Sequence, residues 1–141
     1  MISTKGRYSI RILLDLAQHR SGKYIPMKDV AARQDSSLKY SERLTPALRT
    51  AGLIESVHGI GGGYRLTRDP EEYTLWEILL LSEGDLAPVS CLQAGAEPCA
   101  RAAECRTLSV WEGYYKLTKD YFSGITLADL LDTPTADNYV I

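Results

Sequence analysis

Hydrophobic residues recur every three or four positions near the start of the chain. From Thr4 onwards this spacing predicts an amphipathic helix that buries one face in a core, with apolar positions at Ile10, Leu13, Leu14 and Ala17. A second, shorter helix is predicted after Pro26. Proline suits the first turn of a helix, because its missing N–H would have no intrahelical partner there.

A third helix is predicted between an N-cap at Ser36 or Ser37 and a stop at Gly52, with apolar positions at Leu38, Leu44, Leu48 and Ala51. Pro46 lies inside this helix and predicts a kink, because proline removes a backbone hydrogen bond and crowds the preceding turn. Only a few residues join the second helix to the third. This arrangement is typical of a helix-turn-helix, in which the third helix would be the recognition helix.

Two short stretches, residues 53–57 and 64–67, predict β-strands. The glycine-rich segment 58–63 between them predicts a hairpin tip, since glycines permit positive φ and let the backbone approach phosphates closely. A hairpin directly after a helix-turn-helix indicates a wing. The alternative is a nucleotide-binding loop, but the segment lacks the lysine and Ser/Thr of a P-loop and opens no helix.

Three more helices are predicted in the second half. Thr74 and Thr126 each begin a capping-box pattern, and a long helix runs from Thr107 to Gly124 with an aromatic stripe. Because interfaces are rich in aromatic residues, we predict a dimer interface at Leu108, Trp111, Tyr115, Thr118 and Phe122. The alternative is that the stripe packs on its own domain. The expected fold is mainly α with a small β-hairpin wing: a winged helix-turn-helix domain plus a long C-terminal dimerisation helix.

Charge divides the chain of 141 residues into two unlike halves. Residues 1–68 carry a net charge of +7, residues 69–141 carry −9, and the whole chain carries −2. A basic half gains affinity for a polyanion by releasing counterions from phosphates, although chance clustering on a solvated surface is the simpler alternative. We therefore predict a DNA-binding domain at residues 1–70 and an acidic dimerisation and sensor region at residues 71–141.

Three cysteines, Cys91, Cys99 and Cys105, lie in a segment whose Gly95 and Pro98 indicate a loop, residues 91–105. Thiolates are soft ligands for iron-sulfur clusters, zinc or copper(I), and a flexible loop can fold three of them about one centre. A complete tetrahedral site needs a fourth ligand, and no histidine lies nearby in sequence. A redox-active thiol switch and unreactive cysteines are the alternatives.

Several classes of protein are excluded by what the sequence lacks. No run approaches the roughly 18 apolar residues of a membrane span, and the N-terminus lacks a signal-peptide core, so a cytoplasmic protein without a membrane partner is expected. Neither His19 nor His58 has a neighbouring acid and nucleophile, and no cofactor motif is present. We therefore expect neither an enzyme nor a small-molecule substrate.

Four motifs carry a resemblance that extends over nearly the whole chain: Lys5-Gly-Arg-Tyr8, Ser37-Leu-Lys-Tyr-Ser-Glu-Arg-Leu44, Leu48-Arg-Thr-Ala-Gly-Leu53 and Ser56-Val-His-Gly-Ile-Gly-Gly-Gly-Tyr64. With the three-cysteine loop and Ile125-Thr-Leu-Ala-Asp-Leu130, the chain resembles the IscR/NsrR/CymR-type (BadM/Rrf-type) winged helix-turn-helix regulators. The resemblance implies a homodimer on a pseudo-palindromic operator of double-stranded DNA. It also implies a recognition helix in the major groove and a wing tip in the minor groove.

The resemblance and the polar side of the third helix together give the predicted DNA contacts: Lys28, Ser37, Lys39, Tyr40, Glu42, Arg43, Arg49, His58, Gly59, Gly61, Gly62 and Tyr64. Tyr40 and Glu42 match positions that resemble base-reading residues, and a glutamate can accept a hydrogen bond from cytosine. His58 stands where the family often has arginine. This departure weakens the expected minor-groove contact, because imidazole is shorter than guanidinium and mostly neutral near pH 7.

Several members of the family hold an iron-sulfur cluster that controls DNA binding, which implies a 2Fe-2S or 4Fe-4S cluster at Cys91, Cys99 and Cys105. Leu108 replaces the ligating histidine of IscR-like members, and Tyr8 replaces the ligating aspartate of NsrR-like members, so the fourth ligand is unassigned. The predicted function is a homodimeric transcriptional regulator that senses iron, redox state or nitric oxide. The alternative is a regulator without a cluster, controlled by a protein partner or by thiol oxidation.

Overall fold

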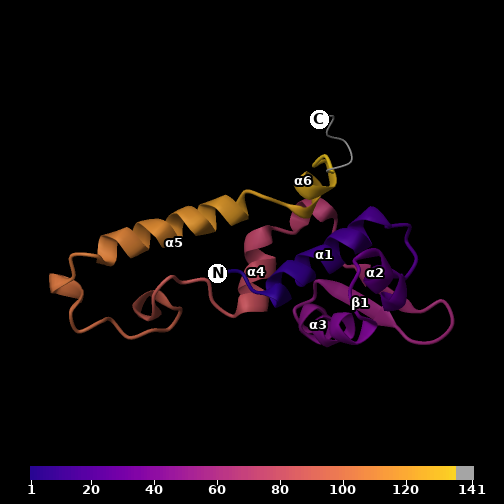
Figure 1. Ribbon diagram of the computed structural model, residues 1–141, viewed down its shortest axis with the longest axis horizontal. Helices are drawn as coiled ribbons and strands as arrows, with labels where there is room; N and C mark the ends of the chain where they lie inside the picture. Colours follow the sequence, from indigo (N-terminus) through magenta and orange to yellow (C-terminus); the bar gives the residue numbers. More distant parts are fainter. Residues whose placement is uncertain (136–141) are drawn as a thin grey trace.

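The computed structural model of the protein has a helical body from which an arm projects (Figure 1). It describes residues 1–135, so the last six residues of the predicted region 71–141 lie outside the described residues. The helices and strands are α1 (Thr4–Gln18), α2 (Met27–Arg33), α3 (Leu38–Thr50), β1 (Ile54–Val57), β2 (Gly63–Leu66), α4 (Leu75–Glu83), α5 (Leu108–Ser123) and α6 (Leu127–Leu131). Single-turn 3₁₀ helices lie at Pro70–Glu72, Ser90–Leu92 and Ala102–Glu104. The predicted mainly α fold with one small hairpin is confirmed.

Helix α1 lies at the centre of the body. It begins after Ser3, whose hydroxyl accepts a hydrogen bond from the Gly6 amide at 3.2 Å, the usual role of an N-cap serine. Its apolar face is completely buried, at Ile12, Leu13 and Leu16. The amphipathic pattern of the sequence therefore located this helix and its buried face correctly.

A buried carboxylate on α1 fixes the end of α2. Asp15 is fully buried and accepts hydrogen bonds from Arg33 Nε and Nη2 and from Gln34 Nε2, at distances of 2.7 to 3.2 Å. The hydrogen bond to Asp15 raises the pKa of Arg33 above its ordinary value, so the guanidinium stays charged. A buried carboxylate without such partners would be costly, so this pair holds α1 against the segment that precedes α3.

Helix α3 continues through Pro46 to Thr50 as one helix. Proline cannot donate to the carbonyl four residues earlier, which is that of Glu42. The hydroxyl of Thr45 donates to this carbonyl instead, at 3.0 Å. The neighbouring threonine therefore supplies the hydrogen bond that the proline removes, and Leu44 and Leu48 stay on one buried face.

The two strands form an antiparallel hairpin in which Ile54 pairs with Leu66 and Val57 with Gly63. A third segment joins its edge, where the Ile25 and Tyr64 amides and carbonyls exchange two hydrogen bonds of 2.8 Å. Gly63 makes this approach possible, because a Cβ at this position would lie 2.3 Å from the Ile25 carbonyl oxygen and its φ is +147°. The base of the hairpin is thus anchored to the turn before α2.

The replacement Gly63→Ala is expected to lower the free energy of unfolding by about 2–4 kcal/mol, since it sets a methyl group against backbone and strains φ. Urea unfolding followed by circular dichroism measures the change. Gly61→Ala is the matched control: Gly61 also has a positive φ, of +76°, but nothing lies within 4 Å of its Cβ position. This control should cost only about 1 kcal/mol. Equal losses in the two variants would show that the close approach is unimportant.

One continuous core joins both halves of the chain. Tyr73, Leu75, Ile78 and Leu127 pack with the buried residues of α1, α3 and β1. The Tyr73 hydroxyl donates to the Leu53 carbonyl at 2.6 Å and accepts from the Thr67 and Arg68 amides, so it holds the two ends of the hairpin together.

The arm consists of α5 and the loop that precedes it, and the cysteine loop lies at its far end (Figure 1). Among the described residues, no helix combines the length and the apolar character needed to cross a membrane.

Candidate DNA-binding surface, dimerisation helix and cysteine loop

The exposed side of α3 carries three of the predicted DNA contacts with long charged side chains beyond its core face: Lys39, Glu42 and Arg43, with Arg49 one to two turns further on. Ser37 is the N-cap and accepts a hydrogen bond from the Tyr40 amide at 3.1 Å. Its role in the structure is therefore to start the helix. Tyr40 itself is half-buried.

The basic side chains of this surface are free to meet phosphates. The ion pairs found within residues 1–135 involve other cations of the body, such as Arg33 with Asp15 and Arg68 with Glu77, and do not include Lys28, Lys39, Arg43 or Arg49. All four of these side chains are exposed. Unpaired cations on an exposed helix face favour a polyanionic partner.

An aromatic and polar network positions the start of α3, and the sequence analysis did not identify it. Tyr8 and Tyr40 meet edge to face with ring centroids 5.6 Å apart, and the guanidinium of Arg11 lies 4.7 Å from the Tyr8 ring centre. Arg11 also donates to the side chain and the carbonyl of Gln34, in the turn before α3. No pattern along the chain links these residues, because they come together only after α1 packs against α3.

The hairpin lies directly beside the recognition helix. Arg49 Nη1 donates to the Ser56 hydroxyl at 3.3 Å, and the Thr45 hydroxyl donates to the Tyr64 hydroxyl at 3.4 Å. Tyr64 is half-buried and packs against the core, so it supports the wing from below. His58, Gly59 and Gly61 are exposed at the tip, whereas Gly62 is half-buried.

The five residues predicted for the dimer interface lie mostly on the side of α5 that meets the rest of the chain. Tyr115 contacts Trp76 of α4 edge to face at 5.9 Å, and Phe122 packs against the core. Leu108 and Thr118 are half-buried, and Trp111 is 38% exposed. The alternative that this stripe packs on its own domain therefore describes Tyr115 and Phe122.

A neighbouring stripe on α5 is exposed instead. Val110, Tyr114, Leu117 and Tyr121 are 58%, 56%, 72% and 66% exposed. Their spacing of four, three and four residues is that of a coiled-coil seam. The sequence signal for this stripe was present, but each Tyr-Tyr or Tyr-Phe pair on α5 fits two adjacent lines along a helix, and only packing on α4 distinguishes them.

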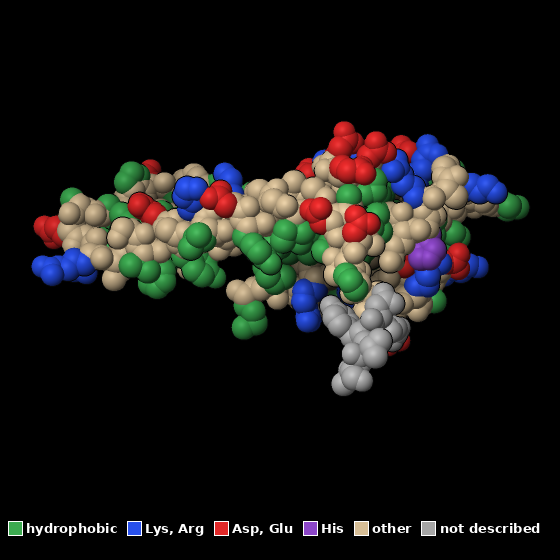
Figure 2. Space-filling model, turned by 90° about the horizontal axis from the view of Figure 1, so that it is seen from above, with side chains coloured by type: hydrophobic (Ala, Val, Ile, Leu, Met, Phe, Trp, Pro, Cys, Tyr) green, Lys and Arg blue, Asp and Glu red, His purple; other side chains and the backbone are tan. Residues whose placement is uncertain are grey.

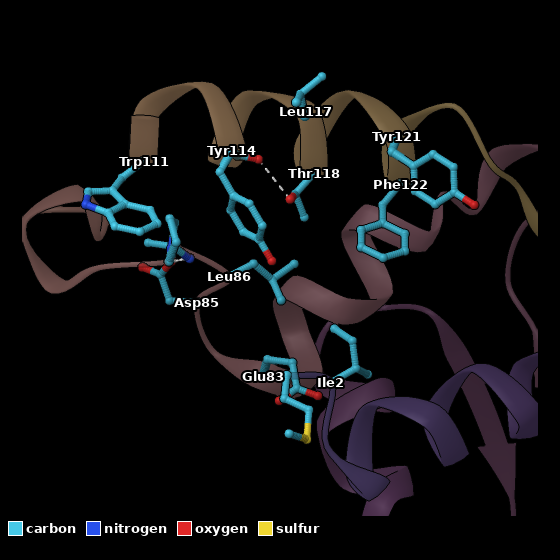
Figure 3. A pocket seen from close by; sticks show the side chains of 13 residues that line it. Ile2, Glu83, Asp85, Leu86, Trp111, Tyr114, Leu117, Thr118, Tyr121 and Phe122 are labelled. Atoms are coloured by element: carbon cyan, nitrogen blue, oxygen red, sulfur yellow. Dashed lines mark hydrogen bonds between the residues drawn. The ribbon is translucent and has the colours of Figure 1, made fainter. Parts of the chain in front are cut away.

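A groove of about 790 Å³ opens below α5. Trp111, Tyr114 and Phe122 point from the helix towards Leu86 and Ile2, whereas Leu117 points to the opposite side (Figure 3). The far wall is the segment after α4, which Asp85 holds in place by accepting hydrogen bonds from the Ala87 and Ala94 amides. This segment leads directly into the cysteine loop.

The three cysteines are free thiols on a surface loop. Cys99 and Cys105 are exposed and Cys91 is half-buried. Among the described residues, no three His, Cys, Asp or Glu side chains are gathered closely enough to hold a metal ion. The donor set suits a cluster, since thiolates are the usual ligands of iron-sulfur centres, but the loop would have to close around it.

Cys105 is the cysteine with a perturbed thiol. Hydrogen bonds from Thr107, whose hydroxyl lies 3.5 Å from Sγ, lower the pKa of Cys105. A lower pKa increases the thiolate fraction at a given pH, and the thiolate is the reactive form.

We expect Thr107→Val to shift the pH profile of Cys105 alkylation by iodoacetamide to higher pH in the metal-free protein. The rate near neutral pH should fall severalfold, because the valine cannot donate to the thiolate. Mass spectrometry of timed reactions measures each cysteine separately. Cys99 in the same variant is the internal control and should keep its profile; an unchanged Cys105 profile would contradict the role of Thr107.

The fold and this surface together define a winged helix-turn-helix DNA-binding protein. Residues 2–133 match the Rrf2 family, described as "Iron-dependent Transcriptional regulator". The chain belongs to this family, and it is a DNA-binding transcriptional regulator and not an enzyme. The resemblance seen in the sequence is thereby confirmed.

The relatives include regulators with different names. The chain is 34% identical to the HTH-type transcriptional regulator IscR of Aliivibrio salmonicida, over 92% of this chain and 76% of the relative. It is 38% identical to the protein rrf2 of Nitratidesulfovibrio vulgaris, over 92% and 86%. Among solved structures, IscR of T. potens (32% identical, TM-score 0.73, covering 100% of this chain and 93% of that one) has the same fold. So does CymR, described as the global cysteine regulator of B. subtilis (32%, 0.77, 96% and 98%).

Proposed function

We propose that the protein is a homodimeric regulator whose two recognition helices bind a pseudo-palindromic operator. The observation that carries this proposal is the exposed apolar stripe of α5, formed by Val110, Tyr114, Leu117 and Tyr121. Exposed apolar side chains at this density on a projecting helix cost free energy in water, and a second copy of the helix would cover them.

The groove below α5 supports the same arrangement. Its apolar lining continues from the stripe through Tyr114 and Tyr121 to Ile2 and Leu86 of the body. Figure 2 shows hydrophobic side chains exposed along the arm. A two-fold interface uses the same patch on both subunits, so one helix and one groove are sufficient for a closed dimer.

In the proposed complex, the exposed side of α3 lies in the major groove. Glu42 and Tyr40 read base edges, and Lys28, Lys39, Arg43 and Arg49 neutralise phosphates, because these cations are exposed and free of ion pairs within the described residues. Ser37 and Tyr64 act by holding the helix and the wing in place.

We further propose that Cys91, Cys99 and Cys105 hold an iron-sulfur cluster. Three soft donors on one loop, the match to a family described as iron-dependent, and a loop anchored through Asp85 to the wall of the groove support this. When bound, the cluster would supply a chemical group that responds to iron, oxygen or nitric oxide. The chain's own contribution is to link the position of the cysteine loop to the interface of α5.

Anaerobic purification followed by iron and acid-labile sulfide assays tests the cluster. The expected result is a coloured protein with iron and sulfide in near-equal amounts, and loss of most of both in Cys99→Ala. Ser90→Ala, which changes an exposed residue beside Cys91 without removing a thiol, is the matched control and should keep the metal. A colourless protein without iron or sulfide would contradict the cluster and leave the DNA-binding function unchanged.

Regulation without a cluster is the second candidate. The cysteines are not gathered in the described structure, the thiol of Cys105 has a lowered pKa, and the CymR structures share the fold. In that case oxidation of Cys105, or a protein partner, would provide the input. Replacement of all three cysteines by serine with unchanged regulation in cells would favour the protein partner over both kinds of thiol chemistry.

A further inference from the structure

The tip of the wing is a narrow and closed turn. The Gly62 amide donates to the Gly59 carbonyl at 3.0 Å, and Gly59 and Gly61 adopt positive φ of +93° and +76°. A Cβ on Gly62 would lie 2.3 Å from the Val57 carbonyl oxygen, so the two sides of the turn are in direct backbone contact. The tip is therefore little wider than two strands of bare backbone.

One large side chain stands on this turn. Ile60 is fully exposed, with a relative exposure of 109%, and its neighbours in the turn are glycines. An isoleucine that remains in water forgoes the roughly 1.5–3 kcal/mol that burial of such a side chain contributes. Any surface that the tip approaches meets Ile60 first.

The tip has no charge with which to bind phosphate. From Ser56 to Tyr64 the chain contains no Asp, Glu, Lys or Arg, and its one titratable group besides the Tyr64 phenol is His58. Electrostatic attraction to DNA thus comes from α3 and not from the wing. The chemistry that the tip offers is apolar contact and narrow shape.

The position of the hairpin relative to α3 determines what the tip can reach. Three residues separate α3 from β1, and the contacts of Arg49 with Ser56 and of Thr45 with Tyr64 fix the hairpin against the helix. Figure 1 shows the tip projecting from the body beyond α3. A helix in the major groove, about 12 Å wide, leaves such a projection over the neighbouring minor groove, about 6 Å wide, which admits a thin tip.

We propose that Ile60 enters the minor groove and selects A·T base pairs beneath the wing, a proposal that rests on DNA binding through α3. The floor of the groove carries only acceptors at A·T pairs, whereas guanine adds an amino group that projects into the groove. The methyl groups of Ile60 would collide with this amino group or leave it without water. Apolar side chains that enter the minor groove are a known means of recognising its shape.

The test uses a duplex selected from genomic fragments by the wild-type protein, with the base pairs beneath the wing replaced in turn by A·T, G·C and inosine·C. Inosine·C has the minor-groove edge of A·T and lacks only the amino group of G·C. The wild type should bind the A·T and inosine·C duplexes equally and the G·C duplex about tenfold more weakly, a mismatch cost of ordinary size.

The variant Ile60→Ser should bind all three duplexes within about twofold of one another. Ile60 makes no contact that holds the fold, so circular dichroism should report a folded variant, and Ile60→Leu should keep the preference. An equal A·T preference in Ile60→Ser and wild type, or inosine·C behaving as G·C, would overturn the proposal. Failure of the wild type to bind any duplex would instead contradict DNA binding through α3.

Discussion

Leu117→Glu is expected to convert the dimer to a monomer at micromolar concentration. Leu117 is the most exposed residue of the α5 stripe, and a two-fold interface would bury two new carboxylates at its seam. An uncompensated charge in an interface costs several kcal/mol, and each 1.4 kcal/mol corresponds to a factor of ten, so the dimer dissociation constant should rise by roughly a thousandfold. Sedimentation velocity over a concentration series measures it.

Ser123→Glu is the matched control for this variant. It adds the same charge to the same helix, at an exposed position away from the stripe, and should leave the dimer intact. Operator affinity should fall with dimer content, because a monomer presents one recognition helix to a two-fold site. A Leu117→Glu protein that sediments as the wild type does would show that the stripe is not the interface.

The double replacement Lys39→Ala and Arg43→Ala is expected to weaken operator binding by about 10- to 100-fold at fixed salt. Both side chains are exposed on α3 and lie outside the ion pairs found in the described residues, so their loss removes phosphate contacts without breaking the fold. The slope of log affinity against log salt should fall by about one for each lost contact and each half-site. Fluorescence anisotropy between 50 and 200 mM salt, within the range where such slopes are linear, measures both effects.

Lys116→Ala with Lys119→Ala controls for net charge, since it removes two exposed cations from α5. This control should keep the affinity within about twofold, because long-range charge is screened beyond about 8–10 Å. Equal losses in the two double variants would indicate that overall charge, and not the surface of α3, determines binding.

The fold was predictable where periodicity and caps determine it. Helix α1 follows from the spacing of Ile12 to Leu16, and the helices that begin after Thr74 and Thr126 follow from their capping residues. The hairpin follows from its glycines. The kink predicted at Pro46 shows the limit of such rules, since the hydroxyl of Thr45 satisfies the carbonyl that proline leaves free.

The candidate site was predictable only in part, because its remainder depends on packing between distant segments. The polar side of α3 and the exposed wing were identified from sequence. The Tyr8, Arg11 and Gln34 network was not, since it requires α1 to lie beside α3. On α5, Trp76 of α4 decides which of two adjacent stripes is covered, and no pattern within α5 contains that information.

The most direct test of dimeric operator binding is selection of genomic DNA fragments by the purified protein, followed by sequencing. The account predicts that bound fragments share an inverted repeat with half-sites about 34–36 Å apart along the helix axis, or a multiple of that distance. It also predicts that the Leu117→Glu protein enriches none of them. Enrichment of a single asymmetric site, or the same fragments bound by Leu117→Glu, would contradict it.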